Sequence, residues 1–216
     1  MKDRHEPPRA YRSPLRAAQA QQTRQSILDA ARALFITKGW VGTTIAAIAA
    51  DASVSNETVY SVFGAKRAIL QTLISDAVRG HSPDVPLLQQ ETPSAIAAAT
   101  DPRRQIALFA RDIAGVLSRV APLMAVLRAA AETEPKLAGL YRQIHEGRRA
   151  NLAFVAEALV RNGPLREGMD VNAATATIWR LASPDLFLLM RDVEGVDGDG
   201  YATWLEQSLV ALLLPS

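Results

Sequence analysis

The sequence predicts an all-α protein, with an N-terminal three-helix domain that contains a helix-turn-helix and a helical C-terminal domain. Three observations favour this class. Apolar residues recur at helical spacing along most of the chain. Proline, glycine and hydroxyl residues stand where helices would start and stop, and no segment shows the strict alternation of a half-buried strand. With 216 residues, 49% of them hydrophobic, the chain can bury a substantial core.

Composition excludes several classes of site and points to one class of partner. Without cysteine, the chain has no disulfide, no thiolate nucleophile and no cysteine-ligated metal. The N-terminus lacks the apolar segment of a signal peptide, and no apolar run is as long as a membrane span, so we expect a cytoplasmic protein without a membrane partner. Residues 1–80 carry 11 Lys and Arg against 6 Asp and Glu, whereas residues 81–216 carry 13 against 16. This asymmetry indicates a polyanionic partner at the N-terminal end.

The N-terminal third contains residues that predict where its helices begin and end. The first helix is expected from near Thr23 to Gly39, a residue type that commonly ends helices. Thr44 can cap the second helix and Ser55 the third, because a hydroxyl accepts a hydrogen bond from a free backbone N–H of the first turn. Gly64 ends the third helix, and a longer fourth helix follows directly. Two short helices with a four-residue turn make a helix-turn-helix.

The pattern of the C-terminal part predicts a series of longer helices. A connector marked by prolines precedes them, and the stretches are expected near 94–100, 102–120, 122–132, 135–162, 170–191 and 200–214. Pro122 is expected to separate the second stretch from the third, and Ser183-Pro184 to interrupt the fifth. The leucine-rich runs at 186–189 and 212–214 exceed what one buried face requires, and this favours a helical dimer interface.

The third helix is short and amphipathic. At roughly 100° per residue, Val59, Val62 and Phe63 fall on one side and can pack on the first two helices. The other side carries polar residues, namely Asn56, Glu57, Tyr60 and Ser61, with Thr58 at the edge. A helix of this kind fits the major groove of DNA, although a plain helical hairpin with a solvated face has the same pattern.

The N-terminal pattern resembles the DNA-binding domain of the tetracycline-repressor (TetR) family over residues 23–70. The matching residues are Thr23-Arg24, Ile27-Leu28, Ala30-Ala31, Leu34-Phe35, Gly39, Thr43-Thr44, Ile48-Ala49, Ala52, Val54-Ser55, Thr58-Val59-Tyr60, Phe63, Lys66 and Leu70. The resemblance implies a homodimeric DNA-binding regulator without enzymatic activity or cofactor. We accordingly expect a basic flexible arm at 1–20, a helix-turn-helix DNA-binding domain at 21–80, and a ligand-binding and dimerisation domain at 81–216.

The resemblance also implies roles for individual residues. Thr44, Tyr60 and Lys66 match positions that contact phosphates. The base-facing stretch corresponds to Ser55, Asn56, Glu57, Thr58 and Ser61. Ser53 stands where the family usually has glycine in the turn, and a serine with positive φ would cost about 1 kcal/mol there.

The C-terminal domain is expected to enclose a pocket for a small, largely apolar effector. Candidate lining residues are Phe109, Met124, Tyr141, His145 and Trp179, a mixture of large apolar and polar groups that is typical of ligand pockets. The complete hypothesis is a repressor that the effector releases from a palindromic operator, with no catalytic residue and no metal. A helical regulator without an effector and a helical enzyme are the alternatives that the sequence leaves open.

Overall fold

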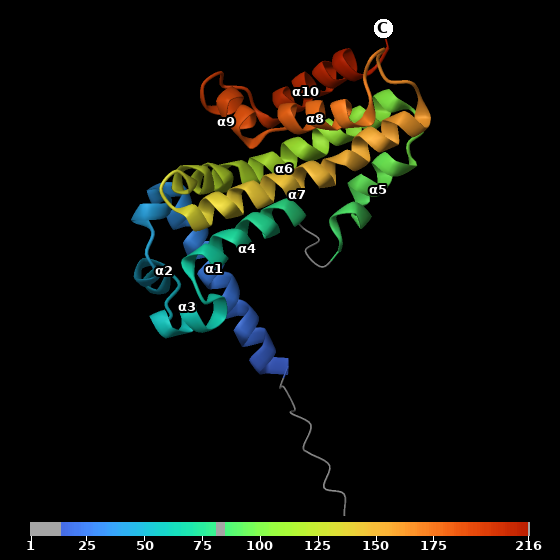
Figure 1. The fold of residues 1–216 in the computed structure, drawn as a ribbon. Helices are drawn as coiled ribbons and strands as arrows, with labels where there is room; N and C mark the ends of the chain where they lie inside the picture. The colour runs from blue at the N-terminus through green and yellow to red at the C-terminus, as the bar shows by residue number, and fades with distance from the viewer. Residues whose placement is uncertain (1–13, 81–84, 216) are drawn as a thin grey trace, which may run out of the picture.

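Helices account for all the regular structure in the computed structural model, which describes residues 14–80 and 85–215 (Figure 1). They are α1 (Pro14–Gly42), α2 (Ile45–Asp51), α3 (Asn56–Phe63), α4 (Lys66–Arg79), α5 (Glu91–Ala98), α6 (Pro102–Ala131), α7 (Pro135–Asn162), α8 (Val171–Leu181), α9 (Pro184–Asp192) and α10 (Gly198–Leu213), with a short 3₁₀ turn at Leu87–Gln89. The predicted all-α class is confirmed. Figure 1 shows α1, α2 and α3 at one end of the molecule, and α8, α9 and α10 at the other.

Helix α1 starts earlier than the sequence indicated. The predicted flexible arm covered residues 1–20, but α1 begins at Pro14, so the second part of that prediction is wrong; residues 1–13 lie outside the described residues. The helix continues through strong helix formers such as Ala17, Ala18 and Gln19. Residues 16–22 are all exposed, so this part of α1 has no apolar face that periodicity would reveal.

The longest helix, α6, runs through the centre of the C-terminal domain. Its buried side chains include Ile106, Leu117 and Leu127, and it packs against α4, α7, α9 and α10. The expected break at Pro122 is wrong, because α6 continues across it from Pro102 to Ala131. Proline costs a helix one hydrogen bond, and here the buried neighbours Ala121 and Leu123 hold the helix in place. Among the described helices, α6 alone is long and apolar enough to cross a membrane, but half of its apolar window is buried inside the protein.

The last three helices close the domain over α6 and α7. The expected interruption at Ser183-Pro184 is confirmed, since Ser183 Oγ accepts a hydrogen bond from Leu186 N (3.1 Å) and starts α9. The phenol of buried Tyr201 on α10 donates to the carbonyl of Leu181 at the end of α8 (2.8 Å). These two contacts fix the turn between α8 and α9, which borders one of the cavities described below.

The turn between α2 and α3 requires a left-handed residue. Ser53 has φ 55° and is the one residue other than glycine with positive φ in the described chain. Its N–H donates to Ala50 O (3.1 Å), and the N–H of Val54 donates to Ala49 O (2.9 Å). This is the Schellman pattern, whose left-handed position normally holds glycine.

Replacing Ser53 with glycine should therefore stabilise the protein. We expect the free energy of unfolding to rise by about 1 kcal/mol and the melting temperature by about 2–4 °C, because glycine adopts positive φ without a Cβ clash. Ser53→Ala is the matched control and should bring no gain, since alanine keeps the Cβ. Thermal and urea unfolding measure both variants, and equal stability of the two would contradict the strain at this position.

Candidate nucleic-acid interface and ligand cavities

Helix α3 is held by contacts at both ends and in the middle. Ser55 Oγ accepts a hydrogen bond from Thr58 N (3.2 Å), as predicted for the N-cap, and lies 3.1 Å from Thr58 Oγ1. Val59 is completely buried against the rest of the N-terminal domain. Gly64 follows the helix with φ 72° and ends it. A cap, an apolar anchor and a terminating glycine thus fix the helix while its polar side remains outside.

Most of the predicted DNA-contacting residues are exposed to solvent. The exposed ones are Thr44, which caps α2, and Ser55, Asn56, Glu57, Tyr60 and Ser61 of the α3 region, whereas Thr58 is half-buried. Thr44 accepts the capping hydrogen bond from Ala47 N (3.1 Å). The interpretation of Val62 as a packing residue is wrong, because its side chain is 38% exposed. Hydrogen bonds from the backbone and from Ser55 lower the pKa of Glu57, so its carboxylate stays ionised on this face.

Lys66 is bound within the protein. Its Nζ donates to the carbonyl oxygens of Trp40 and Thr43, both at 2.7 Å, and lies 4.0 Å from the centre of the Trp40 ring. An ammonium group has three N–H donors, so one remains for a phosphate in the role that the resemblance implies. Burial lowers the pKa of Lys66, while nearby Glu134 opposes the shift. In the structure this lysine serves mainly as a hydrogen-bond donor to backbone carbonyls at the end of α1.

An inner cavity of about 690 Å³ lies between α4, α6 and α7. Phe109 and Met124, two of the five predicted pocket residues, line it. Most of its wall is apolar, with Ile74, Val78, Ile113, Val116, Leu117, Val120, Ile144, Leu152 and Phe154 among the contributors. Asp112 and Asn151 add polar groups that were not among the predicted pocket residues. Burial raises the pKa of Asp112, although a hydrogen bond with Thr92 and the charge of Arg119 oppose the shift.

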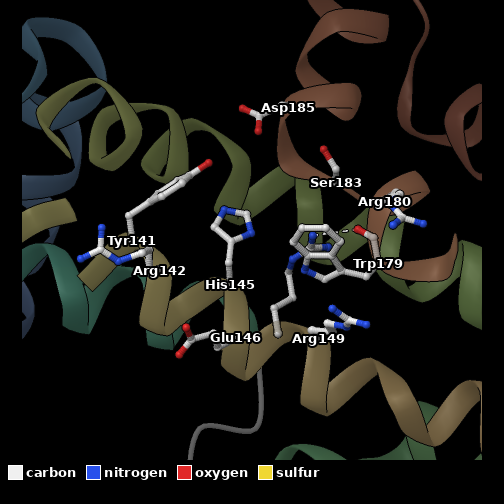
Figure 2. A pocket seen from close by; sticks show the side chains of 10 residues that line it. Tyr141, Arg142, His145, Glu146, Arg149, Trp179, Arg180, Ser183 and Asp185 are labelled. Carbon is white, nitrogen blue, oxygen red and sulfur yellow. Dashed lines mark hydrogen bonds between the residues drawn. The ribbon is translucent and has the colours of Figure 1, made fainter. Parts of the chain in front are cut away.

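A second, outer cavity of about 550 Å³ lies between α7 and the α8–α9 turn (Figure 2). Tyr141, His145 and Trp179, the other three predicted pocket residues, line this cavity and not the inner one. The prediction of one pocket therefore brought together residues of two sites. Among the described residues, Arg148 alone lines both cavities, and it was not among the pocket residues predicted from the sequence. Within the described chain, no cluster of three or more His, Cys, Asp or Glu residues is arranged to hold a metal ion.

The family model of bacterial regulatory proteins of the tetR family matches residues 27–73, which run from α1 into α4. The chain carries a tetR-family domain. A curated relative, the HTH-type transcriptional regulator AlkX of Mycobacterium tuberculosis, is 35% identical over 60 residues. That match spans 28% of this chain and 28% of AlkX.

Solved structures extend the similarity of fold to most of the chain. A transcriptional regulator from Saccharomonospora viridis in complex with choline has a TM-score of 0.69 at 17% identity, and the match covers 91% of this chain and 100% of that one. NalD, the secondary repressor of the MexAB-OprM multidrug efflux pump in Pseudomonas aeruginosa, has a TM-score of 0.68 at 22% identity (91% and 99%). FadR from Bacillus subtilis, in complex with stearoyl-CoA, has a TM-score of 0.68 at 19% identity (87% and 97%). At these identities the likeness shows a shared fold.

The tetR-family domain is joined to the C-terminal domain by specific polar contacts. Trp40 Nε1, near the end of α1, donates to Glu134 Oε1 in the α6–α7 turn. Arg32 donates to the carbonyl of Arg119 (3.0 Å), and Arg119 Nε donates to the carbonyl of Ala77 on α4 (3.0 Å). These contacts were not predicted, because their partners are 42 to 94 positions apart in sequence.

Proposed function

We propose that this protein is a cytoplasmic, non-enzymatic transcriptional repressor that binds a palindromic operator as a homodimer and leaves it when a small, largely apolar ligand fills the inner cavity. The observation that carries the proposal is the exposed polar side of α3 within a tetR-family domain. In this reading Asn56, Thr58 and neighbouring polar groups meet base edges, and Tyr60 and Thr44 contact phosphates.

The inner cavity is the better candidate for the effector site. Its wall is mainly apolar, and a few polar groups such as Asp112 and Asn151 would orient a ligand. Two proteins of the same fold hold small molecules in their structures, choline in one and stearoyl-CoA in the other. The polar group of the ligand would meet Asp112 or Asn151, since Tyr141 and His145 line the other cavity.

Helix α4 offers a direct mechanical link between this cavity and DNA. Its first residue, Lys66, is bound to the end of α1, and its later residues Ile74 and Val78 line the cavity wall. A ligand that prefers a displaced α4 would move the tetR-family domain with it. In a dimer, the recognition helices must stay about 34–36 Å apart to enter successive major grooves, so such a shift lowers DNA affinity.

The homodimer would form through the last helices. Much of the leucine-rich sequence is buried within the chain itself, including Phe187 and Leu213, so the apolar excess is smaller than the sequence suggested. Leu189, Val193 and Leu212 remain 49%, 75% and 43% exposed. A second copy packed on these side chains would remove them from water.

Operator binding provides the decisive test. We expect two chains per duplex on a palindromic site selected from a random library, with affinity that falls steeply as salt rises, because phosphate contacts release counterions. Tyr60→Ala should weaken binding to all duplexes, whereas Asn56→Ala should relax base preference at one position of each half-site. Sedimentation gives the stoichiometry, and fluorescence anisotropy at two salt concentrations gives the affinities.

The matched control is Thr100→Ala, an exposed position between α5 and α6 that lies outside both the tetR-family domain and the last helices, which should leave operator affinity unchanged. Equal affinity for selected and scrambled duplexes would contradict sequence-specific recognition. Binding of one chain per duplex would contradict the homodimer while leaving recognition by α3 intact.

A further inference from the structure

The outer cavity contains an unusual group of buried polar atoms. Four nitrogens are buried without a hydrogen-bond partner: Nδ1 and Nε2 of His145, Nε1 of Trp179 and Nε of Arg148. All three residues line this cavity. Buried polar groups are nearly always paired in folded proteins, so a cluster of unpaired ones at the edge of a cavity indicates a missing partner.

The three side chains form one continuous group. The His145 ring meets Tyr141 edge to face at 4.4 Å and Trp179 at 5.9 Å between ring centres. The guanidinium carbon of Arg148 lies 5.1 Å from the centre of the Trp179 ring, and its two terminal nitrogens donate to the carbonyls of Trp179 (2.8 Å) and Ala182 (2.9 Å). Figure 2 shows His145 between Tyr141 and Trp179, with Ser183 and Asp185 across the opening.

Hydrogen-bond acceptors on a ligand would satisfy most of these unpaired nitrogens. The Trp179 and Arg148 nitrogens can only donate, and a neutral histidine adds one further donor and one acceptor. Within this group, three of the four unpaired nitrogens are therefore donors. A ligand that satisfied them would bring at least two acceptor oxygens.

Charge around the cavity favours an anion. Four arginines line it, namely Arg142, Arg148, Arg149 and Arg180, against the two carboxylates Glu146 and Asp185. Asp185 is paired with Arg128 on α6 at 2.6 Å, so its charge is already compensated. The remaining excess is positive, while the rings of Tyr141, His145 and Trp179 provide flat apolar walls.

We propose that the outer cavity is a second ligand site, which binds a small planar organic carboxylate. The flat body of the ligand lies against the rings, and its carboxylate accepts hydrogen bonds from Trp179 Nε1, Arg148 Nε and one nitrogen of His145. Because all of these nitrogens are buried in the unliganded protein, the His145 ring, the Trp179 indole and the Arg148 side chain turn toward the cavity on binding to present them. This site shares only Arg148 with the inner cavity among the described residues and contains no residue of α3, so it does not depend on the proposed operator binding.

Benzoate is the probe, and the unmodified protein is titrated with it by calorimetry and by tryptophan fluorescence. We expect one saturable site per chain, with benzamide, the neutral analogue, binding about tenfold more weakly and benzylamine, a cation, not at all. The ring nitrogen resonances of His145, assigned by their loss in His145→Phe, should shift during the titration.

Variants locate the binding site. Trp179→Phe keeps a ring but removes the donor and should weaken benzoate binding about tenfold. Met124→Phe changes only the inner cavity and should leave benzoate affinity unchanged. Three results would overturn the proposal: no saturable binding of benzoate, equal affinity for benzoate and benzamide, or loss of benzoate binding in Met124→Phe with none in Trp179→Phe. The comparison of benzoate with benzamide on the unmodified protein decides the matter if a variant fails to fold.

Discussion

Replacing Trp40 with alanine should lower the free energy of unfolding by about 3–5 kcal/mol, the usual cost of removing a buried aromatic side chain. Trp40 is 8% exposed and stacks on Phe35 with ring centres 5.8 Å apart. The ammonium group of Lys66 lies over its ring, and Glu134 accepts a hydrogen bond from its N–H. This one side chain therefore connects α1, α4 and the α6–α7 turn. Urea unfolding followed by circular dichroism measures the loss.

Trp40→Phe separates packing from the hydrogen bond. It keeps an aromatic ring and removes the donor to Glu134, which is exposed and can be solvated instead, so the expected cost is only about 0.5–1.5 kcal/mol. A loss below about 1 kcal/mol in Trp40→Ala would show that this contact does not hold the two domains together.

Replacing Lys66 with methionine should destabilise the protein by about 2 kcal/mol, because it leaves the carbonyls of Trp40 and Thr43 without their charged donor. Methionine preserves the length and most of the volume of the side chain. Lys66→Arg is the matched control, since it retains the charge and several donors, and it should lose less. Urea unfolding of both variants without DNA measures this effect.

A role of Lys66 limited to phosphate binding predicts a different pattern. Stability would then be unchanged in Lys66→Met, and the slope of operator affinity against salt would fall by about one counterion. Both effects together would show that the third N–H of the ammonium group reaches DNA.

The features that the sequence predicted correctly are those decided by neighbouring residues. Ser55, Thr44 and Gly64 act on helix ends within four positions of themselves, and each lies where the pattern placed it. The predictions that proved wrong concern features that depend on tertiary packing. Pro122 is retained inside α6 because buried neighbours support the helix there, and no local pattern reveals that support.

The ligand cavities show the same limit. Tyr141 and His145 lie on α7 within about one turn of Ile144, yet they line the outer cavity and Ile144 lines the inner one. Which face of a helix meets which cavity depends on the neighbours packed on each side. The charged groups Asp112 and Arg148 were overlooked because their burial depends on helices distant in sequence.

The first two turns of α1 do not share in the stability of the folded domain. Residues 16–22 are helical but exposed on every side, so the rest of the protein does not stabilise them. These turns therefore form and melt in a local helix–coil equilibrium, which responds to temperature independently of global unfolding. Amide hydrogens in this segment should therefore exchange with solvent by fraying, while those from Ile27 onward exchange only when the domain opens.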